Sequence, residues 1–148
     1  EGTNVSEGRG TTRPFEIFGA PFVDGARLAR EIIGPGARLR PLTFEPTFNK
    51  FTRAHCGGVQ VHVYDANALR SYDLYLRAIA WIARHASEFA WRTEPYEYVN
   101  DRPAVDLLTG GPEFRAVASS ASALEDYLAA GTVQLREFAL RRRSWLLY

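Results

Sequence analysis

The clearest alternation of hydrophobic and polar positions in the chain runs over residues 59–64. Its three valines occupy every second position, which predicts a β-strand that turns them toward a core. Two further extended segments are expected, over residues 15–18 and residues 38–45. In the second of these, Pro41 lacks the amide proton that a central strand would donate, so we expect an edge strand or a bulge. The pattern therefore predicts a small sheet.

Helical spacing appears between and after these strands. Asp24 is a suitable N-cap for a helix that runs to about Ile33, and Ser71 for a longer helix that runs to about Arg84. In the longer helix, apolar and aromatic residues recur at spacings of three and four, which predicts the main core-facing stripe. The members of this stripe are Tyr72, Tyr75, Leu76, Ile79, Ile82 and Ala83.

The C-terminal third of the chain predicts four further helices, bounded by capping residues, glycines and prolines. They are expected over residues 101–110, 112–118, 122–130 and 132–143, with Gly131 separating the last two. The expected fold class is α/β (α+β), with a small mixed sheet packed against one long helix and several C-terminal helices.

Length and composition favour one soluble globular domain. The chain has 148 residues, of which 46% are hydrophobic and 24% charged, enough to bury a core. With 18 basic and 17 acidic residues the net charge is +1, so no overall field attracts nucleic acid or an anionic membrane. No apolar run approaches the roughly 18 residues of a membrane helix.

The cysteine and the histidines do not predict a metal or redox site. Cys56 is the only cysteine, so no internal disulfide can form, and we expect it to be a packing residue. His55, His62 and His85 show no metal-ligand spacing, so we predict no metal and no cofactor. His62 lies on the strand face opposite the valines, where a structural role and a role as acid, base or ligand both remain open.

Candidate chemistry concentrates in residues 1–15, which show no apolar periodicity. Glycines there permit turns that a side chain would block, and the other residues supply many donors and acceptors. The segment is typical of a loop around a polar ligand, although an ordinary solvated loop or a disordered terminus has the same composition. The polar residues are Glu1, Asn4, Ser6, Glu7, Arg9, Thr11 and Arg13.

Two later segments are candidate walls of the same site. In residues 45–51, Asn49 and Lys50 lie between Phe48 and Phe51, a composition suited to stacking on a sugar ring and bonding its hydroxyls. The alternative is that the two phenylalanines turn inward and hold the loop. Residues 89–101 combine aromatic residues with carboxylates, but their spacing does not identify one acid among them.

Residues 1–15 resemble the EGTN-x-S-x-GRGT signature of the bacterial exo-β-N-acetylmuramidases, the NamZ-like glycoside hydrolases. Further matches follow in order along nearly the whole chain. They are Phe18-Gly-Ala-Pro-Phe22, Phe44-Glu-Pro-Thr-Phe-Asn-Lys50, Cys56-Gly-Gly-Val-Gln60, Phe89 with Trp91, Pro95-Tyr-Glu97, Ala104-Val-Asp-Leu-Leu-Thr-Gly110 and Trp145-Leu-Leu-Tyr148. Each motif alone is weak, and their common order makes chance similarity improbable.

The resemblance implies that residues 1–148 are a single C-terminal domain of a two-domain enzyme. The larger, Rossmann-like N-terminal domain of such proteins carries candidate catalytic carboxylates and is absent from this chain. It implies a hydrolase that releases terminal N-acetylmuramic acid from muropeptide sugar chains, with this domain forming one wall of the cleft and inactive alone. It further implies a peptidoglycan-derived saccharide as partner and a periplasmic or secreted location. The balanced charge and the lack of a long apolar run predict no nucleic-acid partner and no membrane insertion.

The resemblance and the loop composition together suggest the site residues. Glu1 is the candidate catalytic carboxylate, or else an acceptor for a sugar hydroxyl. The guanidinium of Arg9 suits the lactyl carboxylate of the muramic sugar. The expected substrate-binding residues are Asn4, Ser6, Arg9, Thr11, Asn49 and Lys50.

Two other functions compete with this reading. A noncatalytic carbohydrate-binding or protein-interaction domain would use the segments near Phe48 and Trp91 as a sugar platform. Phosphate or nucleotide binding by the first loop is weaker, because Gly2, Gly8 and Gly10 fit neither the dinucleotide fingerprint nor the GxxxxGK[ST] loop.

Overall fold

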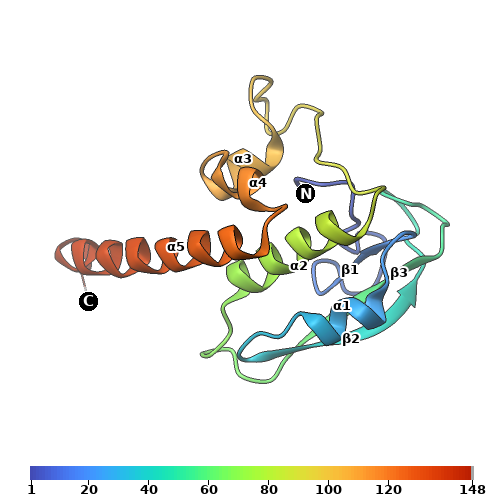
Figure 1. The fold of residues 1–148 in the computed structure, drawn as a ribbon, viewed down its shortest axis with the longest axis horizontal. Coiled ribbons are helices and arrows are strands. Elements are labelled where there is room, and N and C mark those ends of the chain that lie inside the picture. The colour runs from blue at the N-terminus through green and yellow to red at the C-terminus, as the bar shows by residue number, and fades with distance from the viewer. Residues whose placement is uncertain (148) are drawn as a thin grey trace.

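The computed structural model describes residues 1–147. A small sheet and a group of helices lie on either side of one long helix, α2 (Figure 1). This arrangement confirms the expected α+β class. Tyr148, the last residue of the terminal Trp-Leu-Leu-Tyr motif, lies outside the described residues.

The sheet has the strands β1 (Ile17–Ala20), β2 (Ala37–Phe44) and β3 (Cys56–Val63) in the order β1-β3-β2. Both pairings are antiparallel, although we expected a mixed sheet. Strand β3 follows β2 after the loop of residues 45–55 and turns back along it, which makes this pair antiparallel. Pro41 lies in β2 at the sheet edge, as predicted, and faces Val59 of the central strand.

The valines of β3 are only partly in the core. Val59 and Val61 are buried, as the alternation predicted. Val63 is half exposed, because it lies at the end of the strand and lines an open hollow beside Leu69 and Leu74. The alternation thus predicted which face of β3 is apolar, but not at which residue the elements packed on that face end.

Helix α1 (Gly25–Glu31) packs on β2 and β3. Its N-cap is Asp24, as predicted, whose side chain accepts a hydrogen bond of 2.9 Å from the amide of Arg27. The approach to the sheet is so close that a Cβ on Gly25 would collide with the backbone of Gly58. Glycine is therefore a packing requirement at the start of α1.

Helix α2 (Ser71–His85) is the main packing helix, as predicted, and it buries two faces. One face, with Leu74 and Trp81, packs with the sheet and α1 in the first core cluster. The other, with Leu76 and Ala80, packs with the C-terminal helices in a second cluster centred on Phe114. The position of α2 between two layers explains why its burial exceeds one stripe.

Two details of α2 differ from the prediction. Ser71 is the first helical residue and not the N-cap, which is Arg70 and has no side-chain capping bond. Tyr72 is half exposed at the end of the expected core stripe, and its hydroxyl meets that of Tyr127 at 3.1 Å. Tyr72 lies on the side of α2 that faces α5 and lines an open groove there, so the core does not cover it.

The C-terminal elements are α3 (Ala104–Thr109), α4 (Glu113–Val117), α5 (Ala121–Arg142) and the 3₁₀ turn η1 (Arg143–Trp145). Gly110 ends α3 in the left-handed conformation, as its position predicted. Arg115 of α4 donates two hydrogen bonds, of 2.9 and 2.7 Å, to the buried carboxylate of Asp106 and so joins α4 to α3. No helix of the described residues is long and apolar enough to cross a membrane.

The prediction of two helices divided at Gly131 is wrong. Helix α5 runs without interruption through 22 residues, and its last half projects away from the rest of the molecule (Figure 1). One glycine costs a helix only about 1 kcal/mol relative to alanine. The helical hydrogen bonds on both sides of Gly131 outweigh that cost, so a single glycine does not end the helix.

Replacing Gly131 by alanine should raise the free energy of unfolding of this chain by about 0.5–1 kcal/mol. A Cβ at this position meets no atom within 4 Å, so the change adds helix propensity without a clash. Urea unfolding followed by circular dichroism measures the difference. The reverse change at the neighbouring position, Ala130→Gly, should lower stability by a similar amount; a destabilising Gly131→Ala would contradict the prediction.

Candidate functional site

Residues 1–15 form an ordered loop that pairs with two distant parts of the chain. Thr3 bridges to Trp91, and Ser6 bridges to Gly19 with backbone hydrogen bonds of 2.8 and 3.0 Å. The loop therefore lies between β1 and the segment that follows α2. This anchoring places polar side chains from remote segments in contact.

The four charged residues Glu1, Glu7, Arg9 and Lys50 form a continuous network, here called the ionic cluster. Arg9 donates from Nη2 to Glu1 and, over 2.9 Å, from Nε to Glu7. Lys50 Nζ donates to the other oxygen of Glu7 at 2.8 Å and to the carbonyl of Val5 at 3.1 Å. Two acidic and two basic groups balance, so the cluster has no net charge when all are ionised.

The carboxylate of Glu1 accepts hydrogen bonds on both oxygens. The hydroxyl of Tyr96 donates to Oε2 over 2.6 Å, and Arg9 donates to Oε1. The hydrogen bond from Tyr96 and then that from Arg9 hold the pKa of Glu1 below its usual value. Glu1 is therefore ionised at neutral pH, which suits a base, a nucleophile or a charge stabiliser better than a general acid.

Glu7 is more enclosed than Glu1. Burial by itself would raise its pKa, but the hydrogen bond and charge of Lys50 outweigh burial and lower it. Glu7 also raises the pKa of Arg9, after the larger contribution of Glu1. The ionised Glu7 therefore fixes the position of both cations.

Arg9 retains hydrogen-bonding capacity toward a ligand. Its side chain is partly exposed, and two of its five N–H groups bond Glu1 and Glu7. The guanidinium lies 5.1 Å from the centre of the half-exposed ring of Phe15. Three N–H groups thus have no acceptor among residues 1–147 and can bond a ligand such as a carboxylate.

The structure brings the second predicted loop against the first. Thr47 donates to the carbonyl of Gly10 from both its amide and its hydroxyl, each over 3.0 Å. Asn49 adopts a positive φ of 71° and its side chain accepts a hydrogen bond of 2.9 Å from the amide of Lys50. Asn49 is exposed and Lys50 points into the ionic cluster, so only Lys50 of this pair contacts Glu7.

The two phenylalanines of that loop behave differently. Phe48 is 60% exposed, whereas Phe51 packs on Phe22 with ring centres 6.0 Å apart. The alternative of inward-turning aromatics is therefore correct for Phe51, and Phe48 remains available at the surface.

Asn4, Ser6 and Thr11 serve the loop's own structure. The side-chain amide of Asn4 donates through Nδ2 to the carbonyl of Glu88 at 2.8 Å, and its Oδ1 accepts from the backbone amide of Ala90 at 3.0 Å. Ser6 is buried and accepts from the amide of Gly8, and Thr11 donates to the carbonyl of Gly8 over 2.6 Å. These bonds hold the backbone, and a role in substrate binding stays a prediction for all three residues.

Sequence reasoning did not select Glu7 or Tyr96 for the site. Glu7 lies in the same loop, but composition does not distinguish a carboxylate that binds two cations from one in solvent. Tyr96 belongs to the aromatic segment 89–101, where Tyr98 is fully exposed and only Tyr96 reaches Glu1. The pairing joins residues 95 positions apart, a distance at which local pattern carries no information.

The end of the loop lines a separate hollow of about 530 Å³. Arg13, Phe15, His62 and Tyr75 contribute to its wall. His62, whose role the sequence left open, therefore lines this hollow and not the ionic cluster. No member of the ionic cluster lines this hollow.

Comparison with known proteins gives consistent results. A family model described as "Exo-beta-N-acetylmuramidase NamZ, C-terminal" matches residues 1–148. The peptidoglycan β-N-acetylmuramidase NamZ of Bacillus subtilis (strain 168) is 32% identical over 100% of this chain, which spans 35% of that protein. The chain therefore covers about a third of the curated relative that it matches.

A crystal structure of a DUF1343 family protein from Bacteroides fragilis NCTC 9343 has the same fold. It superposes with a TM-score of 0.71 at 24% identity, over 98% of this chain and 38% of that protein. At this identity the likeness concerns the fold alone. The family model covers every position of the sequence, including the loop that builds the ionic cluster, and the chain belongs to the family of the C-terminal region of NamZ exo-β-N-acetylmuramidases.

Proposed function

We propose that this chain is the C-terminal domain of a two-domain exo-acting glycoside hydrolase that releases terminal N-acetylmuramic acid from peptidoglycan-derived sugar chains. The observation that carries the proposal is the ionised Glu1 carboxylate, held between Arg9 and Tyr96 in the loop that carries the family signature. The named activity of the Bacillus subtilis relative supports the same reaction class.

In this proposal the domain supplies one wall of the cleft. Ionised Glu1 either assists the attacking water or sugar or stabilises positive charge that develops on the sugar ring. The acid that protonates the leaving oxygen then comes from the Rossmann-like N-terminal domain, because the pKa of Glu1 is lowered. This division explains why the chain alone should bind saccharide and not cleave it.

The other predicted residues have distinct proposed tasks. The free N–H groups of Arg9 bind the lactyl carboxylate, and Lys50 keeps the cluster neutral through Glu7. Asn49 and Phe48 are exposed beside Gly10 and contact the sugar from the second loop. Asn4, Ser6 and Thr11 act through the loop backbone or, where a donor remains free, on the sugar directly.

The setting follows from the proposed substrate. Peptidoglycan lies outside the cytoplasmic membrane, so we propose a periplasmic or secreted location. The partners are the saccharide and the N-terminal domain. A noncatalytic carbohydrate-binding or protein-interaction role is the second candidate, which the exposed Phe48 favours. Product release by the two-domain protein separates these candidates, since a binding module creates no product.

A titration of N-acetylmuramic acid into this chain, followed by backbone amide shifts, tests the binding half of the proposal. We expect shifts in residues 1–15 and 45–53 that exceed those caused by N-acetylglucosamine, which lacks the lactyl carboxylate. The Arg9→Ala substitution should weaken binding of N-acetylmuramic acid by roughly 10- to 100-fold, because it removes a charged hydrogen bond of about 1.5–3 kcal/mol.

Arg13→Ala provides the matched control, because Arg13 is in the same loop but pairs with Glu16 away from the cluster. The affinity of the Arg13→Ala variant for N-acetylmuramic acid should stay within about twofold of that of the parent chain. Equal binding of both sugars, or equal effects of the two arginine variants, would remove Arg9 from the proposed specificity.

A further inference from the structure

Helix α5 has an apolar stripe that is buried along its first half and exposed along its second. Leu124 and Leu128 are buried in the second core cluster, at 2% and 5% exposure. Leu135 and Phe138 continue the same face at spacings of seven and three, and are 60% and 52% exposed. The face that packs the core thus runs on into solvent.

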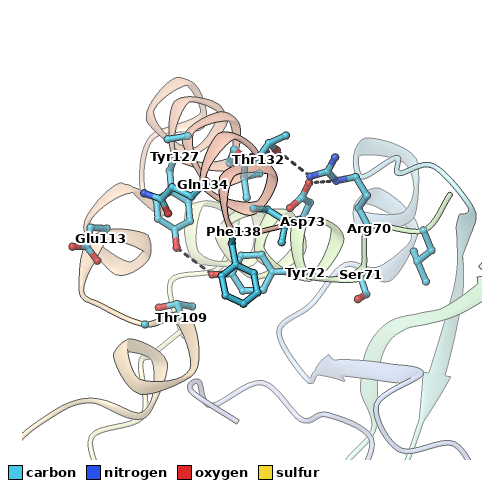
Figure 2. A pocket seen from close by; sticks show the side chains of 16 residues that line it. Arg70, Ser71, Tyr72, Asp73, Thr109, Glu113, Tyr127, Thr132, Gln134 and Phe138 are labelled. Carbon is cyan, nitrogen blue, oxygen red and sulfur yellow. Dashed lines mark hydrogen bonds and ion pairs between the residues drawn. The ribbon is translucent and has the colours of Figure 1, made fainter. Parts of the chain in front are cut away.

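The stripe borders a groove of about 1010 Å³ between α5, the start of α2 and the end of α3, here called the α2–α5 groove (Figure 2). Figure 2 shows Tyr127 and Phe138 of α5 on the side of Tyr72, whose hydroxyl bonds that of Tyr127. Arg70 at the rim pairs with Asp73 over 2.9 Å and donates to Thr132 over 3.0 Å. An aromatic floor with a polar rim is the usual anatomy of a protein–protein contact.

Gly131 lies on the same face and lines the groove. A glycine inside a helix costs about 1 kcal/mol relative to alanine, and no atom within 4 Å of its Cβ position explains the choice. Absence of a side chain at a groove lets another polypeptide approach the helix backbone closely. Gly131 therefore leaves the helix backbone open on this face of α5.

The charges beside the stripe indicate the partner's chemistry. From Gly131 to Trp145 the helix and its final turn carry four arginines, at positions 136, 141, 142 and 143, and one acidic residue, Glu137. An apolar stripe flanked by arginines fits a partner surface with apolar side chains at its centre and carboxylates at its border.

We propose that the α2–α5 groove and the exposed stripe bind the N-terminal region of the same protein. This inference rests on the proposed two-domain enzyme. The chain spans 35% and 38% of the two proteins compared above, so a region larger than this domain adjoins the matching part of those proteins. Gly2 packs directly on Val105 of α3, and Thr109 at the other end of α3 lines the groove. A region joined before Glu1 therefore starts beside the helices that form the groove.

Thiol labelling of two cysteine variants in α5 tests the proposal. Leu135→Cys lies on the stripe and Leu140→Cys lies away from it, and the two leucines have similar exposures of 60% and 63%. Cys56 is fully buried, and burial raises the pKa of its thiol, so its background reaction is slow. Each variant is labelled in this chain alone and in the protein that includes the N-terminal region.

We expect labelling of the Leu135→Cys variant to slow by at least about tenfold when the N-terminal region is present, and labelling of the Leu140→Cys variant to stay unchanged. Equal rates at position 135 in both proteins would overturn the proposal. Protection in this chain alone that grows with concentration, together with a doubled mass in light scattering, would also overturn it by identifying a second copy as the occupant.

The labelling result is independent of catalysis. Hydrolysis without protection of position 135 would reject the proposed surface and leave the proposed function intact. Protection of position 135 without hydrolysis would support the proposed surface and reject the proposed function. Thermal unfolding of both cysteine variants shows whether the helix is preserved.

Discussion

Replacing Glu1 by glutamine in the proposed two-domain protein should lower the rate of N-acetylmuramic acid release by roughly 10²- to 10⁴-fold, the range for a positioned acid or base. The substitution retains the size of the side chain and an oxygen that can accept the bond from Tyr96, but removes the negative charge. Binding of the product sugar should change much less than the rate, because the charge acts on the reacting centre. Release from a muropeptide sugar chain, followed over time, measures the effect.

Glu16→Gln is the matched control, because Glu16 lies just after the same loop and pairs with Arg13 at the surface. Its rate should equal that of the parent protein. Tyr96→Phe supplies a second arm, since it removes the largest contribution that lowers the pKa of Glu1. The pKa of Glu1 should then be higher, so on acidification the rate of the Tyr96→Phe variant should begin to fall at a higher pH than the rate of the parent protein. Retention of more than half the rate in Glu1→Gln would restrict Glu1 to sugar binding or loop structure.

Replacing Gly25 by alanine should lower the free energy of unfolding by about 3 kcal/mol, the upper range for an overpacked core. A Cβ at this position would collide with the nitrogen, carbon and oxygen of Gly58 in the central strand. These are backbone atoms, so no side chain can rotate away, and α1 must move off the sheet. Urea unfolding of this chain measures the loss.

The Gly131→Ala variant is the matched control for Gly25→Ala. The same chemical change is expected to stabilise the chain at position 131, where a Cβ meets no atom within 4 Å, and to destabilise it at position 25. A common sign for both variants would mean that helix propensity and not close packing decides the effect. Loss of the Asp24 cap does not complicate the result, because Gly25 takes no part in that hydrogen bond.

The two core clusters suggest how the site keeps its shape. Helix α2 joins the sheet layer to the C-terminal helices, and the loop of residues 1–15 is fixed at both layers, by Ser6 to Gly19 and by Gly2 to Val105. The ionic cluster therefore rests on backbone contacts to rigid elements. Such support is what the proposed catalytic role of Glu1 requires of its position.

The sequence by itself determined the elements whose signals are local. Alternating valines predicted β3, Asp24 predicted the start of α1, Gly110 predicted the end of α3, and the ordered motifs predicted the family. Each of these depends on neighbouring residues, through the direction of side chains or the capping of a helix end. The α+β class followed from their order along the chain.

Only the tertiary structure decided which distant groups meet. The contacts of Glu1 with Tyr96 and of Glu7 with Lys50 span 95 and 43 positions, and the length of α5 depended on a balance that one glycine did not tip. The exposure of Val63 and Tyr72 likewise depended on where the covering elements end. Local pattern fixes which face of an element is apolar, whereas the packing of whole elements fixes what that face touches.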